Sequence, residues 1–197
     1  MLALQGDFAE HAAALRAAGA EPREVRLPRD LEGLDGLIVP GGESTTIGKL
    51  LVEWQLLAPL RERIEQGFPA WGTCAGAILL AKDVRDALPG QPLLAVMDIA
   101  VRRNAFGRQV QSFEQDLAVP ALGRAPFPAV FIRAPMIEAV SPQTEVLATL
   151  DDGTIVAARQ EQLLATSFHP ELTGDPRFHR LFVAMVERAA QGMKNEE

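Results

Sequence analysis

The sequence predicts a single α/β domain over residues 1–197, with three α/β/α layers, a mostly parallel central sheet and a smaller antiparallel strand region in the second half. In the first half, buried-strand patterns alternate with helical patterns, as they do where crossover helices join parallel strands. In the second half, alternating or β-branched segments follow one another, with a hairpin signal at Asp152-Gly153. A chain of 197 residues without a repeat or linker suits one domain with its own core.

The expected helices follow from capping residues and helix breakers, and they span 8–19, 47–67, 75–82 and 176–191. Asp7 and Glu10 have the spacing of a capping box, so Asp7 is expected to cap the first helix, which Gly19 ends. The second stretch is expected to break near Pro59, because proline interrupts a helix interior.

The expected strands are apolar or alternating segments bounded by glycine, proline or polar residues. They span 24–27, 36–39, 70–73, 98–104, 129–135, 145–150, 154–160 and 163–168. Ahead of them, Met1–Leu4 forms only a short apolar stub, which a turn at 5–7 follows. The segments 36–39 and 70–73 carry no charged residue and are expected to be buried strands, as in a sheet that is buried on both faces.

The composition excludes several classes of protein. The chain has 19 basic and 26 acidic residues, a formal charge of −7 and no run of lysine or arginine, which argues against nucleic-acid or membrane partners. We find neither a signal-peptide pattern nor an apolar run long enough to span a bilayer. The single cysteine excludes an intrachain disulfide and fits a reducing compartment. We therefore expect a soluble, cytoplasmic protein.

The only cysteine, Cys74, lies in the segment "GTCAG", between an expected strand and an expected helix. This pattern is typical of a nucleophile elbow, in which flanking side chains at Gly72 and Gly76 would clash with the neighbouring strand and helix. The start of a helix favours the thiolate, and the N–H of Ala75 could hold a developing oxyanion. The alternative is an inert, buried cysteine.

A cysteine nucleophile needs a base, and the chain has three histidines. His11 and His179 lie in expected amphipathic helices, so we expect them on helix flanks without a catalytic role. His169 follows an apolar strand, at the edge where open α/β sheets build their sites. In extended chain, alternate residues point the same way, so Glu171 could hold one imidazole nitrogen and leave the other for Cys74. A turn with a solvated carboxylate is the alternative.

Other kinds of site are disfavoured. The histidines are scattered and no second cysteine exists, which argues against a metal site. Neither GxGxxG nor GxxxxGK[ST] occurs, so no nucleotide cofactor is indicated, and we expect no cofactor at all. The segment "PGGES" after a buried strand is either a simple turn or a loop that binds an anion or a carbonyl group.

Together, "GTCAG" and "SFHPE" resemble the class I, triad-type glutamine amidotransferases, whose fold is flavodoxin-like. The strings "LQGDFAEH", "PGGESTT", "RNAFGRQVQSFE" and "FIRAP" resemble one branch of these enzymes, the glutaminase subunits of pyridoxal 5′-phosphate synthase. The matching strings extend from Leu4 to Glu171, and "RNAFGRQ" is the most specific of them.

The resemblance implies a role for each matching residue. Cys74 is the nucleophile, His169 the acid and base, and Glu171 its orienter, while Ala75 and Gly42 supply the oxyanion hole. The residues that line the L-glutamine pocket are Gly42, Glu43, Ser44, Arg103, Ile132 and Arg133. The resemblance also implies a partner, a (β/α)8-barrel synthase subunit that receives ammonia internally in a complex of twelve copies of each chain. Without this resemblance, surface salt bridges would be the favoured role of Arg103 and Arg133.

Three other functions stay open at this point. The chain could be the glutaminase subunit of another amidotransferase, such as imidazole glycerol phosphate synthase, and the synthase that activates ammonia release would tell the two apart. It could be an unrelated cysteine hydrolase, which would cleave esters or peptides without glutaminase activity. It could also be a docking protein with a relic triad, which fits poorly because no triad position is substituted.

Overall fold

The computed structural model describes residues 1–103 and 112–194. Its helices are α1 (Phe8–Ala17), α2 (Ser44–Glu53), α3 (Leu57–Glu65), α4 (Ala75–Leu80) and α5 (Arg177–Lys194), with 3₁₀ turns η1 (Pro28–Leu31), η2 (Pro120–Leu122) and η3 (Pro170–Leu172). Its strands are β1 (Leu37–Val39), β2 (Ala70–Thr73), β3 (Ala81–Arg85), β4 (Met97–Arg102), β5 (Ser112–Leu117), β6 (Phe127–Ile132), β7 (Met136–Val140), β8 (Glu145–Thr149), β9 (Ile155–Gln160) and β10 (Leu163–Thr166). Most of the motif "RNAFGRQVQSFE", residues 104–111, lies outside the described residues.

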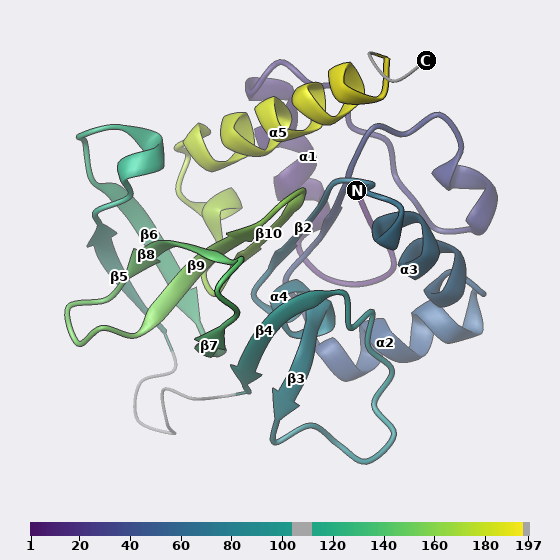
Figure 1. The fold of residues 1–197 in the computed structure, drawn as a ribbon, viewed down its shortest axis with the longest axis horizontal. Coiled ribbons are helices and arrows are strands. Elements are labelled where there is room, and N and C mark those ends of the chain that lie inside the picture. Colours follow the sequence, from purple (N-terminus) through teal and green to yellow (C-terminus); the bar gives the residue numbers. More distant parts are fainter. Residues whose placement is uncertain (104–111, 195–197) are drawn as a thin grey trace.

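The described strands form one large mixed sheet and one small sheet (Figure 1). The large sheet has the order β1-β2-β10-β9-β7-β4-β3, and β8 pairs with β9 beside this path. Strands β1, β2 and β10 run parallel to one another, as do β3 and β4, whereas β9, β7 and β8 pair antiparallel. The small sheet is the antiparallel pair β5-β6. The predicted α/β class, with its antiparallel region in the second half, is confirmed.

The central strands bury both of their faces, which produces two cores. Ile38, Trp71 and Leu164 pack with side chains of α1 and α5. Their neighbours along the same strands belong to a second cluster, which includes apolar side chains of α2, α3 and α4. Because successive residues of a strand point to opposite faces, α1 with α5 and α2 with α3 form the outer layers of a three-layer fold (Figure 1).

Two predictions in the first half need correction. The strand expected over 24–27 is reduced to a single parallel bridge between Leu2 and Val25. The apolar stub at Met1–Leu4 lies between Val25 and β1 instead, and Leu2 N–H donates to Ile38 O of β1 at 3.0 Å. The helix break lies at 54–56, ahead of Pro59, which occupies the first turn of α3, where a proline costs no internal hydrogen bond.

Three strands were not predicted from the sequence. Strand β3 follows α4 directly, so the last two residues of the helix expected over 75–82 belong to a strand. No glycine or proline marks this change in the sequence, and the strand is half polar. Strand β5 alternates exposed and half-buried residues and pairs only with β6, and β7 is a short segment between two antiparallel partners. The edge strand β3 and the outer strand β5 carry weak apolar patterns because a large part of their surface faces solvent, and β7 is short and only partly buried.

Candidate active site

The candidate site lies at the carboxyl ends of the three adjacent parallel strands. Gly41 and Gly42 follow β1, Cys74 follows β2, and His169 comes three residues after β10. Cys74 N–H donates to Thr166 O at 2.8 Å, and His169 N–H donates to Val130 O of β6 at 2.8 Å. The open edge of the parallel sheet therefore brings together residues that are far apart in the sequence.

Cys74 is held on a strained turn. Its backbone has φ 49° and ψ −105°, a conformation that favours glycine and costs a side-chain-bearing residue on the order of 1–3 kcal/mol. A Cβ at Gly76 would lie 1.9 Å from Val39 O, and a Cβ at Gly72 would lie 2.4 Å from the backbone of Gly76. The two glycines are needed because strand, turn and helix pass this close to each other, as the elbow pattern predicted.

The candidate base, His169, is buried and hydrogen-bonded to Glu171. Its Nδ1 lies 2.7 Å from Glu171 Oε1. The expected extended conformation is wrong, because Pro170–Leu172 forms the 3₁₀ turn η3, and this turn brings the carboxylate back to the ring. Burial opposes protonation of His169, but hydrogen bonds to Asp7, Cys74 and Glu171 outweigh it and raise its pKa to about 12. Burial, the largest influence on Glu171, raises the pKa of that carboxyl.

Asp7 does not cap helix α1, although its spacing predicts a capping box. Its side chain makes no capping hydrogen bond, and its Oδ2 lies 3.3 Å from His169 Nδ1. The carboxylate is drawn to the imidazole because a protonated ring offers a stronger donor than a backbone N–H. Two carboxylates, Asp7 and Glu171, therefore surround the same ring nitrogen.

These groups open into a cavity of about 420 Å³, a size typical of pockets for small ligands. The cavity is lined by Gln5, Asp7, Gly42, Glu43, Ser44, Cys74, Ala75, Ile78, Arg103, Ile132, Arg133 and His169. This set includes every residue that the sequence predicted for the site except Glu171, which is buried behind His169. The structure thus brings the predicted nucleophile, base and glutamine-pocket residues to one place.

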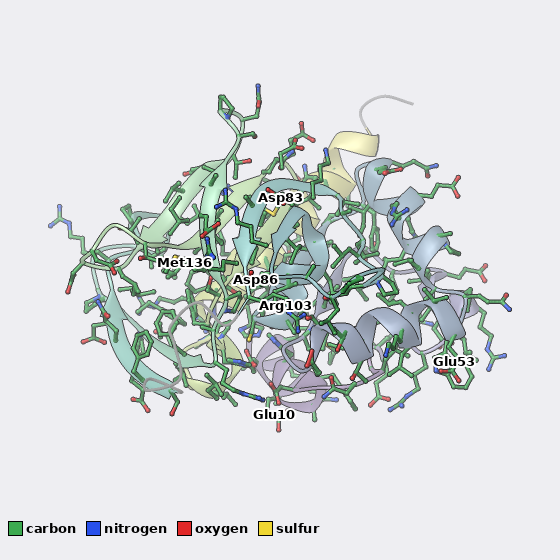
Figure 2. All side chains as sticks on the ribbon, turned by 90° about the horizontal axis from the view of Figure 1, so that it is seen from below. Glu10, Glu53, Asp83, Asp86, Arg103 and Met136 are labelled. Carbon is green, nitrogen blue, oxygen red and sulfur yellow. The ribbon has the colours of Figure 1, made fainter. Side chains whose placement is uncertain are left out.

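Arg103 is built into one wall of the cavity. Its guanidinium donates to Gln91 Oε1 at 3.1 Å and to Glu43 Oε1 at 3.4 Å, and Gln91 in turn donates to Ser44 Oγ at 3.2 Å. In Figure 2, Arg103 lies near the middle of the molecule, where β4 ends close to the start of α2. The side chain is only 12% exposed, so it forms part of the cavity wall.

The end of strand β6 covers the thiol from another side. The Cys74 thiol lies 3.8 Å from Ile132 O, within reach of a weak hydrogen bond. Arg133 follows with a positive φ of 44°, and both Ile132 and Arg133 are exposed at the cavity. This segment can therefore contact a bound ligand and a docked partner alike.

Sequence reasoning overlooked Gln5 and misplaced two histidines. Gln5 Oε1 accepts from Glu43 N–H at 2.8 Å and so holds the loop that follows β1. His11 and His179 do not lie on exposed helix flanks: both are fully buried, and His11 Nδ1 lies 2.9 Å from His179 Nε2. The one available signal was the string "LQGDFAEH", which contains Gln5, Asp7 and His11 and matched the family pattern.

Acid is expected to destabilise the fold through His179. Burial lowers its pKa from 6.5 to about 4. Between these values the unfolded chain binds a proton that the folded chain does not, so stability falls as the pH falls, by about 3 kcal/mol in all. Urea unfolding from about pH 7 to about pH 4 measures this slope. A His179→Gln variant should show a shallower slope, and an unchanged slope would contradict the assignment.

A larger cavity, of about 610 Å³, lies at the other end of the central strands. It is lined by residues of α1, the segment before β1 and α5, including Gly36, Phe182 and Val186. Its lining contains no cysteine, histidine, serine or threonine. The chemistry of the lining, and not the size, therefore identifies the candidate site.

A cysteine on a strained strand-to-helix turn, beside a histidine held by a carboxylate, is the arrangement typical of cysteine-triad enzymes on an open α/β sheet. The chain belongs to the SNO glutamine amidotransferase family, whose sequence model matches residues 1–188. No helix among the described residues is long and apolar enough to cross a membrane.

Individual relatives agree with this family. The chain is 61% identical over 186 residues to the pyridoxal 5′-phosphate synthase subunit PdxT of Herpetosiphon aurantiacus, covering 94% of this chain and 98% of the relative. It is 55% identical to the PdxT of Clavibacter michiganensis, covering 97% and 91%. A crystal structure of a glutamine amidotransferase superposes with a TM-score of 0.89 at 53% identity, covering 94% of this chain and 97% of the other. The structure of PurLQS from Thermotoga maritima shares the fold, with a TM-score of 0.63 at 16% identity and 95% of both chains covered.

Proposed function

We propose that the chain, as one glutaminase domain over residues 1–197, hydrolyses L-glutamine to L-glutamate and ammonia for a pyridoxal 5′-phosphate synthase. The observation that carries the proposal is the strained Cys74 beside the hydrogen-bonded pair His169–Glu171, in a chain of the glutamine amidotransferase family. The relatives named as synthase subunits match nearly the whole chain, which supports the choice of this synthase over another amidotransferase.

The proposed reaction begins with attack of the Cys74 thiolate on the side-chain carboxamide carbon of glutamine. The N–H groups of Ala75 and Gly42 hold the oxyanion, and one such donor is typically worth about 3 kcal/mol. Ala75 suits this role because, as the first residue of α4, its N–H has no acceptor within the helix.

His169 moves the protons in both halves of the reaction. Because hydrogen bonds raise its pKa, the ring holds the proton that the leaving nitrogen needs, and its transfer releases ammonia and leaves a glutamyl thioester on Cys74. The same ring then takes a proton from water, whose oxygen attacks the thioester and frees glutamate. Glu171 fixes the ring orientation and stabilises the imidazolium.

Recognition of glutamine requires partners for its carboxylate and its ammonium group. Arg103 and Arg133 line the cavity and can pair with the carboxylate, and Glu43 can pair with the ammonium group. Gly42, Ser44 and Ile132 complete the wall. The hydrogen bonds from Arg103 to Gln91 and Glu43 hold the guanidinium in place before the substrate arrives, which lowers the entropy lost on binding.

The proposed partner is the one that the family resemblance implies: a (β/α)8-barrel synthase subunit, in a cytoplasmic complex of twelve copies of each chain. Ammonia released into water at neutral pH would be protonated and lose its nucleophilicity, so transfer inside a complex makes chemical sense. In this structure Gln5 holds the loop at Gly42 and Glu43. Docking is proposed to rearrange this loop and so to complete the oxyanion hole.

Glutamate release, measured with and without the synthase subunit, tests the function. We expect the synthase to raise the rate on the order of a hundredfold, the value of one oxyanion donor. Equal rates with and without it would contradict the coupling. Activation by the synthase subunit of imidazole glycerol phosphate synthase in its place would assign the chain to that enzyme, and ester or peptide cleavage without glutaminase activity would indicate an unrelated hydrolase.

A further inference from the structure

A chain of buried polar side chains continues beyond Glu171. While Oε1 of Glu171 contacts His169, its Oε2 lies 3.2 Å from His11 Nε2. The same His11 nitrogen lies 3.0 Å from Thr73 Oγ1, and His11 Nδ1 lies 2.9 Å from His179 Nε2. These residues come from α1, β2, η3 and α5, and the side chains of His11 and Glu171 are both 0% exposed. The roles described above for the triad leave both histidines unused.

The unpaired atoms of this cluster indicate which nitrogens carry protons. Glu171 Oε2 and His179 Nδ1 are buried and form no well-aligned hydrogen bond to the described residues. A proton on Nδ1 of His11 would require His179 to bury an unpaired Nδ1–H, and Glu171 Oε2 would lack a donor. A proton on Nε2 of His11 would lie between Thr73 Oγ1 at 3.0 Å and Glu171 Oε2 at 3.2 Å, so the carboxylate oxygen gains a donor within reach and His179 Nδ1 carries only a lone pair. The second arrangement leaves fewer buried groups unsatisfied.

His11 acts here as a neutral donor. Burial, followed by the proximity of His179, His169 and the N-terminal ammonium group, lowers its pKa well below 6.5. Neutral His11 can satisfy the second carboxylate oxygen without adding a cation that would compete with His169 for the negative charge. Trp71, whose ring lies 5.7 Å from that of His11 and 4.9 Å from that of His179, keeps this side of the carboxylate apolar.

We propose that His11 is a positioning residue of the triad, which donates its Nε2–H to Glu171 Oε2 while His179 fixes the His11 tautomer. Glu171 is thereby held as an anion in the orientation that His169 needs. A buried carboxylate with only one donor would protonate more readily or turn away, since each missing hydrogen bond to a charged group is costly. The proposal rests on the proposed glutaminase function for its kinetic readout.

The test compares His11→Leu with His11→Gln in the complex with the synthase subunit. Leucine removes the donor, whereas the glutamine side chain can place an N–H close to the position of the histidine Nε2. For His11→Leu we expect kcat to fall about tenfold or more, with KM for glutamine unchanged. For His11→Gln we expect most of kcat to return. If both variants fold and the kcat of His11→Gln is no higher than that of His11→Leu, the proposal is overturned.

The pH profile separates positioning from a merely structural role. The titratable groups that face Glu171 and His11 are Asp7, His169 and His179, together with the N-terminal ammonium group. Without the His11 donor, the pKa of Glu171 rises further, so the acid limb of kcat/KM should move up by about one pH unit in His11→Leu and return in His11→Gln. An acid limb that stays in place in His11→Leu would overturn the proposal.

Two further variants test whether His11 acts through Glu171. In a Glu171→Gln background, His11→Leu should lower kcat much less than it does in the wild type, and an equal loss in both backgrounds would overturn the proposal. Leu15→Ala, one turn further along α1, is the control: it should lower stability and leave kcat of the folded enzyme unchanged. If wild-type protein released no glutamate with its partner, the proposed function would fail. An active wild type with an equally active His11→Leu would refute only the role of His11.

Discussion

Replacement of Cys74 by alanine is expected to lower glutamate release by a factor on the order of 10⁴ or more and to leave the fold intact. The thiol forms the covalent bond that splits amide hydrolysis into two easier steps. Among the residues that line the cavity, the only other hydroxyl or thiol belongs to Ser44, at the start of α2. Alanine keeps the Cβ, so the turn and its strain stay as they are. Glutamate release with the synthase subunit present measures the effect.

A glycine at the same position provides the matched control. Glycine removes the thiol as alanine does, but it also relieves the backbone at φ 49° and ψ −105°. We expect Cys74→Gly to be as inactive as Cys74→Ala and more stable than it by about 1 kcal/mol or more. Undiminished glutamate release by either variant would refute Cys74 as the nucleophile. Equal melting temperatures of the two variants would show that the turn stores no strain.

The parts of the site that could be predicted from sequence are those that local crowding or chain direction determines. A Cβ at Gly72 would meet Gly76 of the same strand-turn-helix unit, and a Cβ at Gly76 would meet Val39 of the neighbouring strand β1. Both glycines nevertheless lie within a unit that can be recognised from a few residues. The apolar strands before Cys74 and His169 also indicated the edge of the sheet at which both residues emerge. A local pattern was enough there, because the strained turn itself requires small residues on both sides of the nucleophile.

The parts that could not be predicted depend on contacts between distant elements. His11 and His179 are 168 residues apart, and the helical pattern that surrounds each one does not say which face meets the other. Asp7 matched a capping box, but a charged ring more than 160 positions away attracted its carboxylate. The pairing of Glu171 with His169 was predicted correctly, but the extended conformation from which it was predicted is wrong, because a 3₁₀ turn forms there. Tertiary contacts overrode local preferences at each of these positions.

Replacement of Gly76 by alanine is expected to destabilise the fold strongly. In the interior of a helix, alanine is normally favoured over glycine by about 1 kcal/mol. At this position its Cβ would lie 1.9 Å from Val39 O and 2.8 Å from Val39 C. These are backbone atoms of β1, which is buried on both faces, so the strand cannot move aside as a flexible side chain could. The clash therefore outweighs the helical preference.

We expect Gly76→Ala to lose about 3 kcal/mol or more of stability, which corresponds to a fall in melting temperature of roughly 10 °C. Gly192→Ala is the matched control, since position 192 lies in helix α5 and an added Cβ would have no atom within 4 Å. That variant should gain up to about 1 kcal/mol from helix propensity alone. A melting temperature of Gly76→Ala at or above that of the wild type would mean that α4 and β1 separate without cost. In that case the close approach to Val39 would not be the reason for glycine at position 76. Val39 leads into the Gly41-Gly42 loop, so the distance between the thiol and the proposed oxyanion donor would not be fixed by this contact either.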